Sequence, residues 1–334
     1  MRRVVLSLAC FLSVVLYVPL GCSQSLSVTF ETDAHGGYFW VWDRVQDRLI
    51  AYRHVGQPGV PALRLFGKDG TSAAVIAPLG DFPEAREFII WGVAGTPHGG
   101  VAVAAIADYG EHRVKSLVLS YDGSGKLTKL WDVDPYHHHR LAVDREGNIF
   151  AFGDRGDTRD SNYSLFVKYS PSAKVLREFL PGTSFPMGDD VVGTGGATGE
   201  HQMYISGEEL VVFLAPTREL LRFTLAGNLR SRVSLDPALD KIAAAYNAGR
   251  VEILALGGQS DGPFIAQVRL WPKTGSDQPI RFGMMKFSSD GLTAGLLEPP
   301  AVTLAQGHFL GTTNSGKLLF LEDRGPGHLL LQRY

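Results

Sequence analysis

A unit of about fifty residues recurs six times along this 334-residue chain, and this repeat constrains the fold more than any other feature. Each copy contains a short apolar run that ends in an aromatic residue, then a turn, then a second run. The aromatic positions are Phe66, Tyr121, Tyr169, Phe223, Trp271 and Phe320. A repeat of this length is typically one structural unit that buries its apolar face by stacking on its neighbours.

Alternation within the copies indicates β-strands joined by tight turns. In the third copy, Leu165, Val167 and Tyr169 occupy every second position, which is the period of a strand. Aspartate followed by glycine marks the turns of the first two copies, at 69–70 and 122–123. Glycine suits such turns because it adopts positive φ without a clash of Cβ.

Two further strand-like runs precede each hairpin, most clearly 140–144 and 149–152 in the third copy. The others are 38–42 with 49–52, 88–93 with 101–106, 202–205 with 210–214, 241–246 with 251–256, and 302–305 with 308–312. Four strands repeated six times predict an all-β fold, a six-bladed β-propeller with four antiparallel strands per blade. We expect one propeller domain over residues 22–334, with a short helix after Asp236-Pro237. Two β-sandwich domains are the alternative, which the lack of a Pro/Ser-rich linker disfavours.

The third copy carries a resemblance to a known family. Residues 141–155, LAVDREGNIFAFGDR, form an apolar run ending in Asp144, a Gly-Asn turn and a second run ending near Asp154. This pattern resembles the NHL repeat, closely in this copy and in outline in the others. The resemblance implies a six-bladed propeller. It implies no single activity, because members of that family include ligand-binding modules, scaffolds and lyases.

The N-terminal segment predicts export. Two arginines precede the almost wholly apolar residues 4–20, and small polar residues follow, so we interpret residues 1–21 as a signal peptide. An uncleaved membrane anchor is the alternative, although seventeen residues lie at the short limit of the roughly 17–25 that a membrane span needs. We expect no other contact with a membrane than through this N-terminus.

The two cysteines bear on how the signal peptide is cleaved. Gly21 and Cys22 match a bacterial lipobox, although Pro19 stands where that pattern usually has leucine. Because Cys10 lies in the segment that would be removed, Cys22 would otherwise remain as a lone exported thiol. We therefore predict lipidation at Cys22 and a place in the bacterial cell envelope, as a periplasmic or outer-membrane lipoprotein. Ordinary cleavage after Ser23 is the alternative.

Charge and motifs narrow the classes of function. The formal net charge is −2 and no basic stripe is present, so we expect no binding to nucleic acid. No spacing of Asp, His and Ser fixes a catalytic triad, and the glycine-rich run 193–199 lacks the Gly-Lys-Ser/Thr ending of a phosphate-binding loop. We therefore predict a non-catalytic, monomeric propeller that binds an envelope protein or a small polar ligand at the mouth of its central channel.

Polar side chains recur in the loops that lead into the first strand of each blade, and these are the candidate ligand-binding residues. They are His35, Arg86, His138, His201, Lys241 and Glu298. A solvated polar rim without a ligand is the alternative interpretation. In the run 137–139, His137 and His139 should share one face of a strand with His138 opposite. Three consecutive histidines cannot converge on one ion, so we predict no metal site here.

A Ca²⁺-dependent hydrolase of the six-bladed lactonase type is the alternative function. In that case Glu298 and the turn residues Asn148, Asn247 and Asn314 would gather around a channel calcium. Calcium is the only cofactor that this alternative requires, and otherwise we expect none. A redox propeller with a quinone cofactor has no dedicated residues in this sequence.

Substitution of Cys22 tests the predicted lipid anchor. We expect the wild-type chain to carry the mass of residues 22–334 plus acyl chains, and Cys22→Ala to lose the acyl mass. Intact-mass spectrometry of the purified membrane fraction measures this directly. A wild-type mass equal to an unmodified chain that begins at Gln24 would show ordinary cleavage after Ser23 instead.

Overall fold

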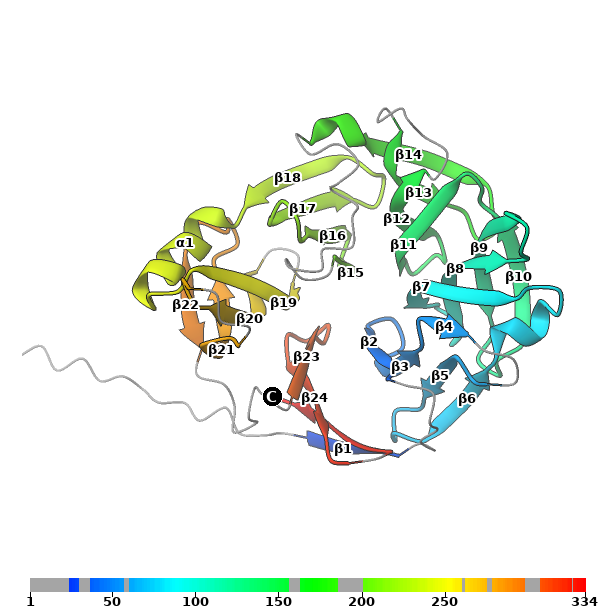
Figure 1. Ribbon diagram of the computed structural model, residues 1–334, viewed down its shortest axis with the longest axis horizontal. Helices are drawn as coiled ribbons and strands as arrows, with labels where there is room; N and C mark the ends of the chain where they lie inside the picture. The colour runs from blue at the N-terminus through cyan, green and yellow to red at the C-terminus, as the bar shows by residue number, and fades with distance from the viewer. Residues whose placement is uncertain are drawn as a thin grey trace, which may run out of the picture.

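The computed structural model describes residues 24–29, 37–56, 60–155, 163–185, 201–259, 262–274, 278–297, 307–325 and 327–334. Their strands form six antiparallel sheets set around a central axis (Figure 1). The predicted all-β, six-bladed propeller is therefore confirmed. Residues 1–21, which were predicted as a signal peptide, and Cys22 lie outside the described residues. No helix in the described ranges is both long and apolar enough to cross a membrane.

Blades 1 to 3 follow one another along the chain. Blade 1 contains β2 (Phe39–Asp43), β3 (Arg48–Tyr52), β5 (Leu63–Phe66) and β6 (Ser72–Ile76). Blade 2 contains β7 (Glu87–Gly95), β8 (Val101–Asp108), β9 (Val114–Tyr121) and β10 (Leu127–Asp132), with the short β4 (Val55–Gly56) added beside β7. Blade 3 contains β11 (Tyr136–Val143), β12 (Ile149–Arg155), β13 (Ser164–Tyr169) and β14 (Val175–Pro181).

Blades 4 to 6 continue the ring. Blade 4 contains β15 (Gln202–Ser206), β16 (Glu209–Leu214), β17 (Glu219–Thr224) and β18 (Leu229–Ser234). Blade 5 contains β19 (Arg250–Gly258), β20 (Phe264–Trp271), β21 (Arg281–Phe287) and β22 (Ala294–Leu297). Blade 6 contains β23 (Gly307–Thr312), β24 (Leu318–Asp323), β25 (His328–Arg333) and β1 (Gln24–Thr29). One α-helix, α1 (Asp236–Ala245), and two short 3₁₀ turns, Pro78–Asp81 and Gly182–Ser184, lie between described strands.

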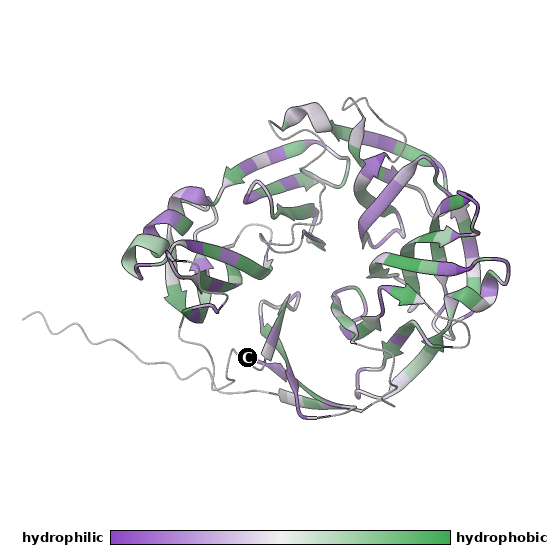
Figure 2. Cartoon of the chain, viewed as in Figure 1, coloured by the Kyte–Doolittle hydropathy of each residue, from purple (hydrophilic) through white to green (hydrophobic). Residues whose placement is uncertain are grey.

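Burial follows the position of each strand within its blade. The second strands β3 and β16 are buried along their whole length, because blades cover both of their faces. The outer strands β10 and β18 are mostly exposed, and β18 shows hydrophobic and hydrophilic bands in Figure 2. Five of the six aromatic repeat positions are buried, and Trp271 is half-buried. The aromatic residue of the repeat is therefore mainly a core residue.

The ring closes with a strand from the other end of the chain. Six residues of β1 pair antiparallel with β25, so the N-terminus supplies the outer strand of blade 6. The sequence predicted residues 302–305 as the first strand of this blade, and these lie outside the described residues. Residues 308–312, predicted as its second strand, belong to β23, the first strand. Val28 of β1 is fully buried in one cluster with Leu331 of blade 6 and Phe66 of blade 1.

Blade 5 departs from the predicted strand pattern. Residues 241–246, which were predicted as a strand, instead form the last turn of α1 and its C-cap, Tyr246. Ala238, Leu239 and Ile242 are the buried residues of this helix, a spacing of one helix face. Alanine at 243–245 also favours helix over strand. The predicted helix after Asp236-Pro237 is confirmed, with Pro237 in its first turn.

Truncation of Val28 tests the contribution of the closing strand. We expect Val28→Ala to lower the free energy of unfolding by about 2 kcal/mol, because it removes two buried methyl groups and leaves a cavity. Guanidinium unfolding followed by circular dichroism measures the change. Thr29→Ala, on the exposed face of the same strand, is the control and should change stability by less than about 0.5 kcal/mol. Equal stability of both variants and the wild type would contradict closure through β1.

Candidate functional site

The first strands of four blades each contain a β-bulge beside the channel. Within β7, β11, β19 and β23 the register shifts by one residue, which leaves Trp91, His139, Leu254 and Leu310 unpaired. A bulge turns its side chain away from the regular alternation of the strand. The first strands of blades 2 and 3 contact each other, and the rings of Trp91 and His139 lie 4.9 Å apart between centroids. Two adjacent bulges thus bring an indole and an imidazole together.

A carboxylate on the neighbouring strand holds two histidines. His139 Nε2 lies 3.0 Å from Asp154 Oδ2, and His137 Nδ1 lies 3.4 Å from Asp154 Oδ1. His138 faces the other way, with its Nε2 at 2.8 Å from the hydroxyl of Tyr169. The predicted division of the three histidines between two faces is therefore confirmed. Gly153 permits this pairing, because a Cβ there would lie 1.9 Å from the carbonyl oxygen of His137.

The ionised carboxylate of Asp154 determines which ring nitrogen of His139 carries a proton. Burial alone would raise the pKa of Asp154, but the hydrogen bonds from His137 and His139 oppose this effect, and that pKa lies well below its usual range. An ionised carboxylate only accepts hydrogen bonds, so His139 Nε2 carries a proton. In the neutral imidazole, His139 Nδ1 is then an acceptor. Both His139 Nδ1 and Trp91 Nε1 are buried without a hydrogen-bond partner among the described residues.

Two further side chains hold the bulges in place. Arg140 Nη1 donates to the carbonyl oxygens of Trp91 at 3.0 Å and His139 at 2.8 Å, and its Nε donates to that of His201 at 2.9 Å. His54 Nδ1 lies 2.8 Å from the carbonyl oxygen of Ile90, and its ring meets Trp91 edge-on at 4.6 Å. We call His54, Trp91, His137, His139 and Asp154 the Trp–His cluster. It joins blades 1, 2 and 3 beside the channel.

The structure separates the residues that were predicted to form one ligand-binding rim. His138 and His201 are each only 4 % exposed, His138 within blade 3 and His201 against Phe152. Arg86 is exposed just before β7, with its guanidinium against Gly110.

Lys241 is also exposed, on α1 at the outer edge of the ring (Figure 1). His35 and Glu298 lie outside the described residues. The four described residues do not converge, and their part in ligand binding stays a prediction.

Neither a metal centre nor a calcium site is assembled in the part of the chain that the structure describes. No three His, Cys, Asp or Glu side chains there are arranged to hold a metal ion. The asparagines of the calcium alternative lie in three separate places. Asn148 donates to Asp144 Oδ2 at 2.8 Å within one turn, Asn247 follows α1, and Asn314 follows β23.

Comparison with known proteins shows the fold alone. No protein-family model matches the sequence, and no curated protein matches it either, so the resemblance to the NHL repeat stays a prediction. A candidate exported protein of Bacteroides fragilis superposes with a TM-score of 0.54 at 10% identity, covering 93% of this chain and 94% of its own. A DUF4221-family member from Bacteroides vulgatus gives 0.52 at 10% identity, with 93% and 96% covered.

A gluconolactonase from Xanthomonas campestris is also similar, with a TM-score of 0.47 at 13% identity and with 94% of this chain and 88% of its own covered. A superposition this loose carries no argument about chemistry. The two Bacteroides proteins support the propeller architecture and no specific activity.

The buried His138 predicts a dependence of stability on pH. Burial lowers the pKa of His138 to about 3, with further lowering by its histidine neighbours. Between pH 6.5 and 3 the unfolded chain binds a proton that the folded chain does not, so stability falls as the pH falls through this window. We expect His138 to contribute roughly 1 kcal/mol per pH unit between pH 6 and pH 5.

Urea unfolding at pH 7, 6 and 5 measures this slope. His138→Gln should have a shallower slope than the wild type, because glutamine does not titrate. His98→Gln, at an exposed histidine, should keep the wild-type slope. An unchanged slope in His138→Gln would show that this histidine is not held neutral by the fold.

Proposed function

We propose that this chain is an exported, non-catalytic propeller that binds a hydroxyl-bearing polar ligand, such as a carbohydrate, at the Trp–His cluster. One observation carries the proposal. Trp91 Nε1 and His139 Nδ1 are buried side by side, and neither has a hydrogen-bond partner among the described residues. A buried polar atom without a partner costs about 1–3 kcal/mol, so a ligand group that bonded to both atoms would recover this free energy.

A hydroxyl group matches these two atoms. Its oxygen accepts from the indole N–H of Trp91, and its proton is donated to Nδ1 of His139. The half-buried indole ring of Trp91 also offers an apolar face on which the C–H groups of a sugar ring can lie. The carboxylate of Asp154 holds His139 in the tautomer that accepts. The cluster therefore selects for a donor and acceptor in one group, which a carboxylate or an ammonium does not provide.

Two features support a place in the cell envelope. The apolar run 4–20 and the lipobox-like Gly21-Cys22 are typical of an exported lipoprotein. The candidate exported protein of Bacteroides fragilis shares the propeller fold. A lipid on Cys22 would keep the propeller at a membrane surface, where envelope glycans and the hydroxyl side chains of a partner protein are both within reach.

Replacement of Trp91 tests the proposed site. We expect Trp91→Phe, which keeps a ring and removes the N–H, to weaken binding roughly 3- to 10-fold through the lost hydrogen bond. The probes are a panel of neutral oligosaccharides and polyols, screened by saturation-transfer NMR and titrated by calorimetry.

Trp131→Phe, on the outer strand β10, is the matched control and should bind as the wild type does. Wild-type protein that binds no member of the panel, or equal affinities in Trp91→Phe and the wild type, would contradict the proposal.

A further inference from the structure

A polar pocket lies at the seam where the ring closes, between turns of blades 1 and 6. Its volume is about 280 Å³, and it is lined by residues 44–47 after β2, by Lys68 after β5 and by residues 313–315 after β23. Blades 1 and 6 form its two sides. The turn that holds Lys68 also touches the closing strand, because a Cβ on Gly70 would lie 2.3 Å from the carbonyl oxygen of Ser27. We call this cavity the seam pocket.

Arg44 lines the seam pocket, and its guanidinium lies beside the pocket without a paired anion among the described residues. Its Nη1 and Nη2 each donate to the carbonyl oxygen of Gly258 at 3.2 Å, and Nη2 also donates to Thr312 Oγ1 at 2.6 Å. The guanidinium stacks on the ring of Tyr204 at 4.1 Å. All of these partners are neutral, and no described carboxylate forms an ion pair with Arg44. Burial lowers the pKa of Arg44, and no acidic residue is among the causes of its shift.

The remaining charges leave the seam pocket with an excess of positive charge. Lys68 is exposed at its edge and forms no ion pair with any carboxylate that the structure describes. Asp47 is the only acidic residue among the lining residues, and it is matched by Arg333, whose Nη1 lies 3.3 Å from Asp47 Oδ2. Thr313 and Ser315 add hydroxyl groups to the walls, and the amides of Gln46 and Asn314 line the pocket while donating to backbone carbonyl oxygens. Such a lining favours an anion with several acceptor oxygens.

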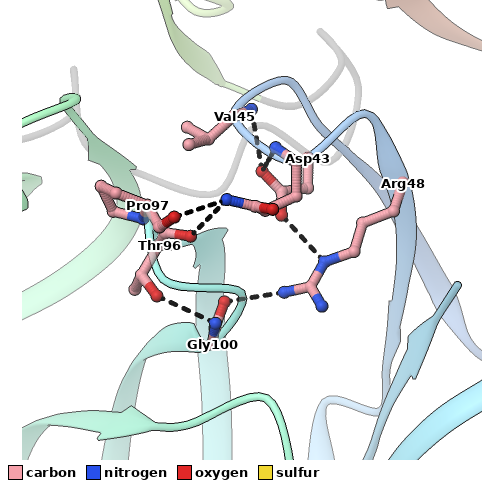
Figure 3. A network of polar contacts seen from close by, with 7 residues as sticks. Asp43, Val45, Arg48, Thr96, Pro97 and Gly100 are labelled. Carbon is pink, nitrogen blue, oxygen red and sulfur yellow. Dashed lines mark hydrogen bonds and ion pairs between the residues drawn. The ribbon is translucent and has the colours of Figure 1, made fainter. Parts of the chain in front are cut away.

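The wall after β2 is held rigid by the network in Figure 3. Asp43 Oδ1 accepts from the backbone N–H of Val45 at 2.9 Å and of Gln46 at 3.2 Å, and its Oδ2 accepts from Arg48 Nε at 3.0 Å. Arg48 Nη2 donates to the carbonyl oxygen of Gly100 at 2.8 Å, which ties the turn to blade 2.

Gln46 adds a second tie, since its Nε2 donates to the carbonyl oxygen of Pro97 at 2.6 Å. From the other side, Asn314 Nδ2 donates to the carbonyl oxygen of Arg44 at 2.8 Å. Arg44 is therefore presented by a preformed wall, which lowers the entropic cost of binding.

We propose that the seam pocket is a second binding site, separate from the Trp–His cluster, for a small oxyanion carrying a carboxylate or phosphate group. The volume suits a molecule of a few non-hydrogen atoms. The Lys68 ammonium closes on the anion from the rim, and the positive field of Arg44 stabilises it from within. The hydroxyl of Ser315, exposed on the facing turn, lies 2.9 Å from Thr313 Oγ1 and would turn its proton from that oxygen to the anion.

Calorimetry on the full-length protein at low ionic strength, where screening is weakest, tests the proposal. The probes are inorganic phosphate and succinate, with sodium chloride as the reference salt. We expect saturable binding of one anion per chain for at least one probe. Lys68→Gln should weaken it roughly tenfold, because a charge-assisted hydrogen bond is lost.

Lys174→Gln is the matched control, because Lys174 is an exposed lysine in the corresponding turn of blade 3. This variant should bind within twofold of the wild type and melt at the same temperature. Binding of phosphate alone or succinate alone assigns the anion class, and either result supports the proposal. It is overturned if neither probe saturates the wild type, or if Lys68→Gln binds as tightly as the wild type.

The two proposed sites are tested independently. Trp91→Phe should leave binding of the oxyanion unchanged, and Lys68→Gln should leave binding of neutral ligands unchanged. Loss of oxyanion binding in Trp91→Phe would overturn the assignment of the anion to the seam pocket.

Discussion

The ring depends on polar side chains that satisfy backbone groups across the interfaces between blades. First strands of neighbouring blades contact each other without pairing, so their free backbone groups need partners from elsewhere. Gln202 bridges blades 4 and 5, because its Nε2 donates to the carbonyl oxygen of Leu254 and its Oε1 accepts from the N–H of Leu256. Gln267 repeats this arrangement between blades 5 and 6, with Gly307 and Phe309. Arg140 joins blades 2, 3 and 4 in the same way.

Both proposed sites arise from this requirement. A bulge exposes a carbonyl group to a bridging side chain, and it also turns its own side chain out of the strand. Arg140 bonds the carbonyl groups at two bulges, and those bulges bring Trp91 and His139 together. Arg44 is a bridging side chain of the same kind, which reaches blades 4, 5 and 6 from blade 1. Its charge exceeds what neutral carbonyl and hydroxyl partners can compensate, so the same contact that joins the blades attracts an anion.

The sequence predicts the architecture well and the sites poorly. Period-two alternation and the buried aromatic positions identify the blades because each copy repeats the same local pattern. The closing strand at Val28 depends on packing against residues that are distant along the chain. If the pairing of Val143 with Ile149 continued along β11 and β12 without a bulge, His137 would lie opposite Arg155. The bulge at His139 shifts the register, so His137 instead pairs with Asp154. No local signal in the sequence marks that bulge.

Closure through β1 also sets an order in time. Among the described strands, β1 is the first to leave the ribosome and pairs only with β25, which is synthesised last. At about 5–20 residues per second, β1 remains without its partner for on the order of tens of seconds. During this delay Val28 lacks the blade 6 half of its cluster, and one edge of the growing protein can pair with another chain. The cell therefore has to keep this short segment apart from its neighbours until the ring is complete.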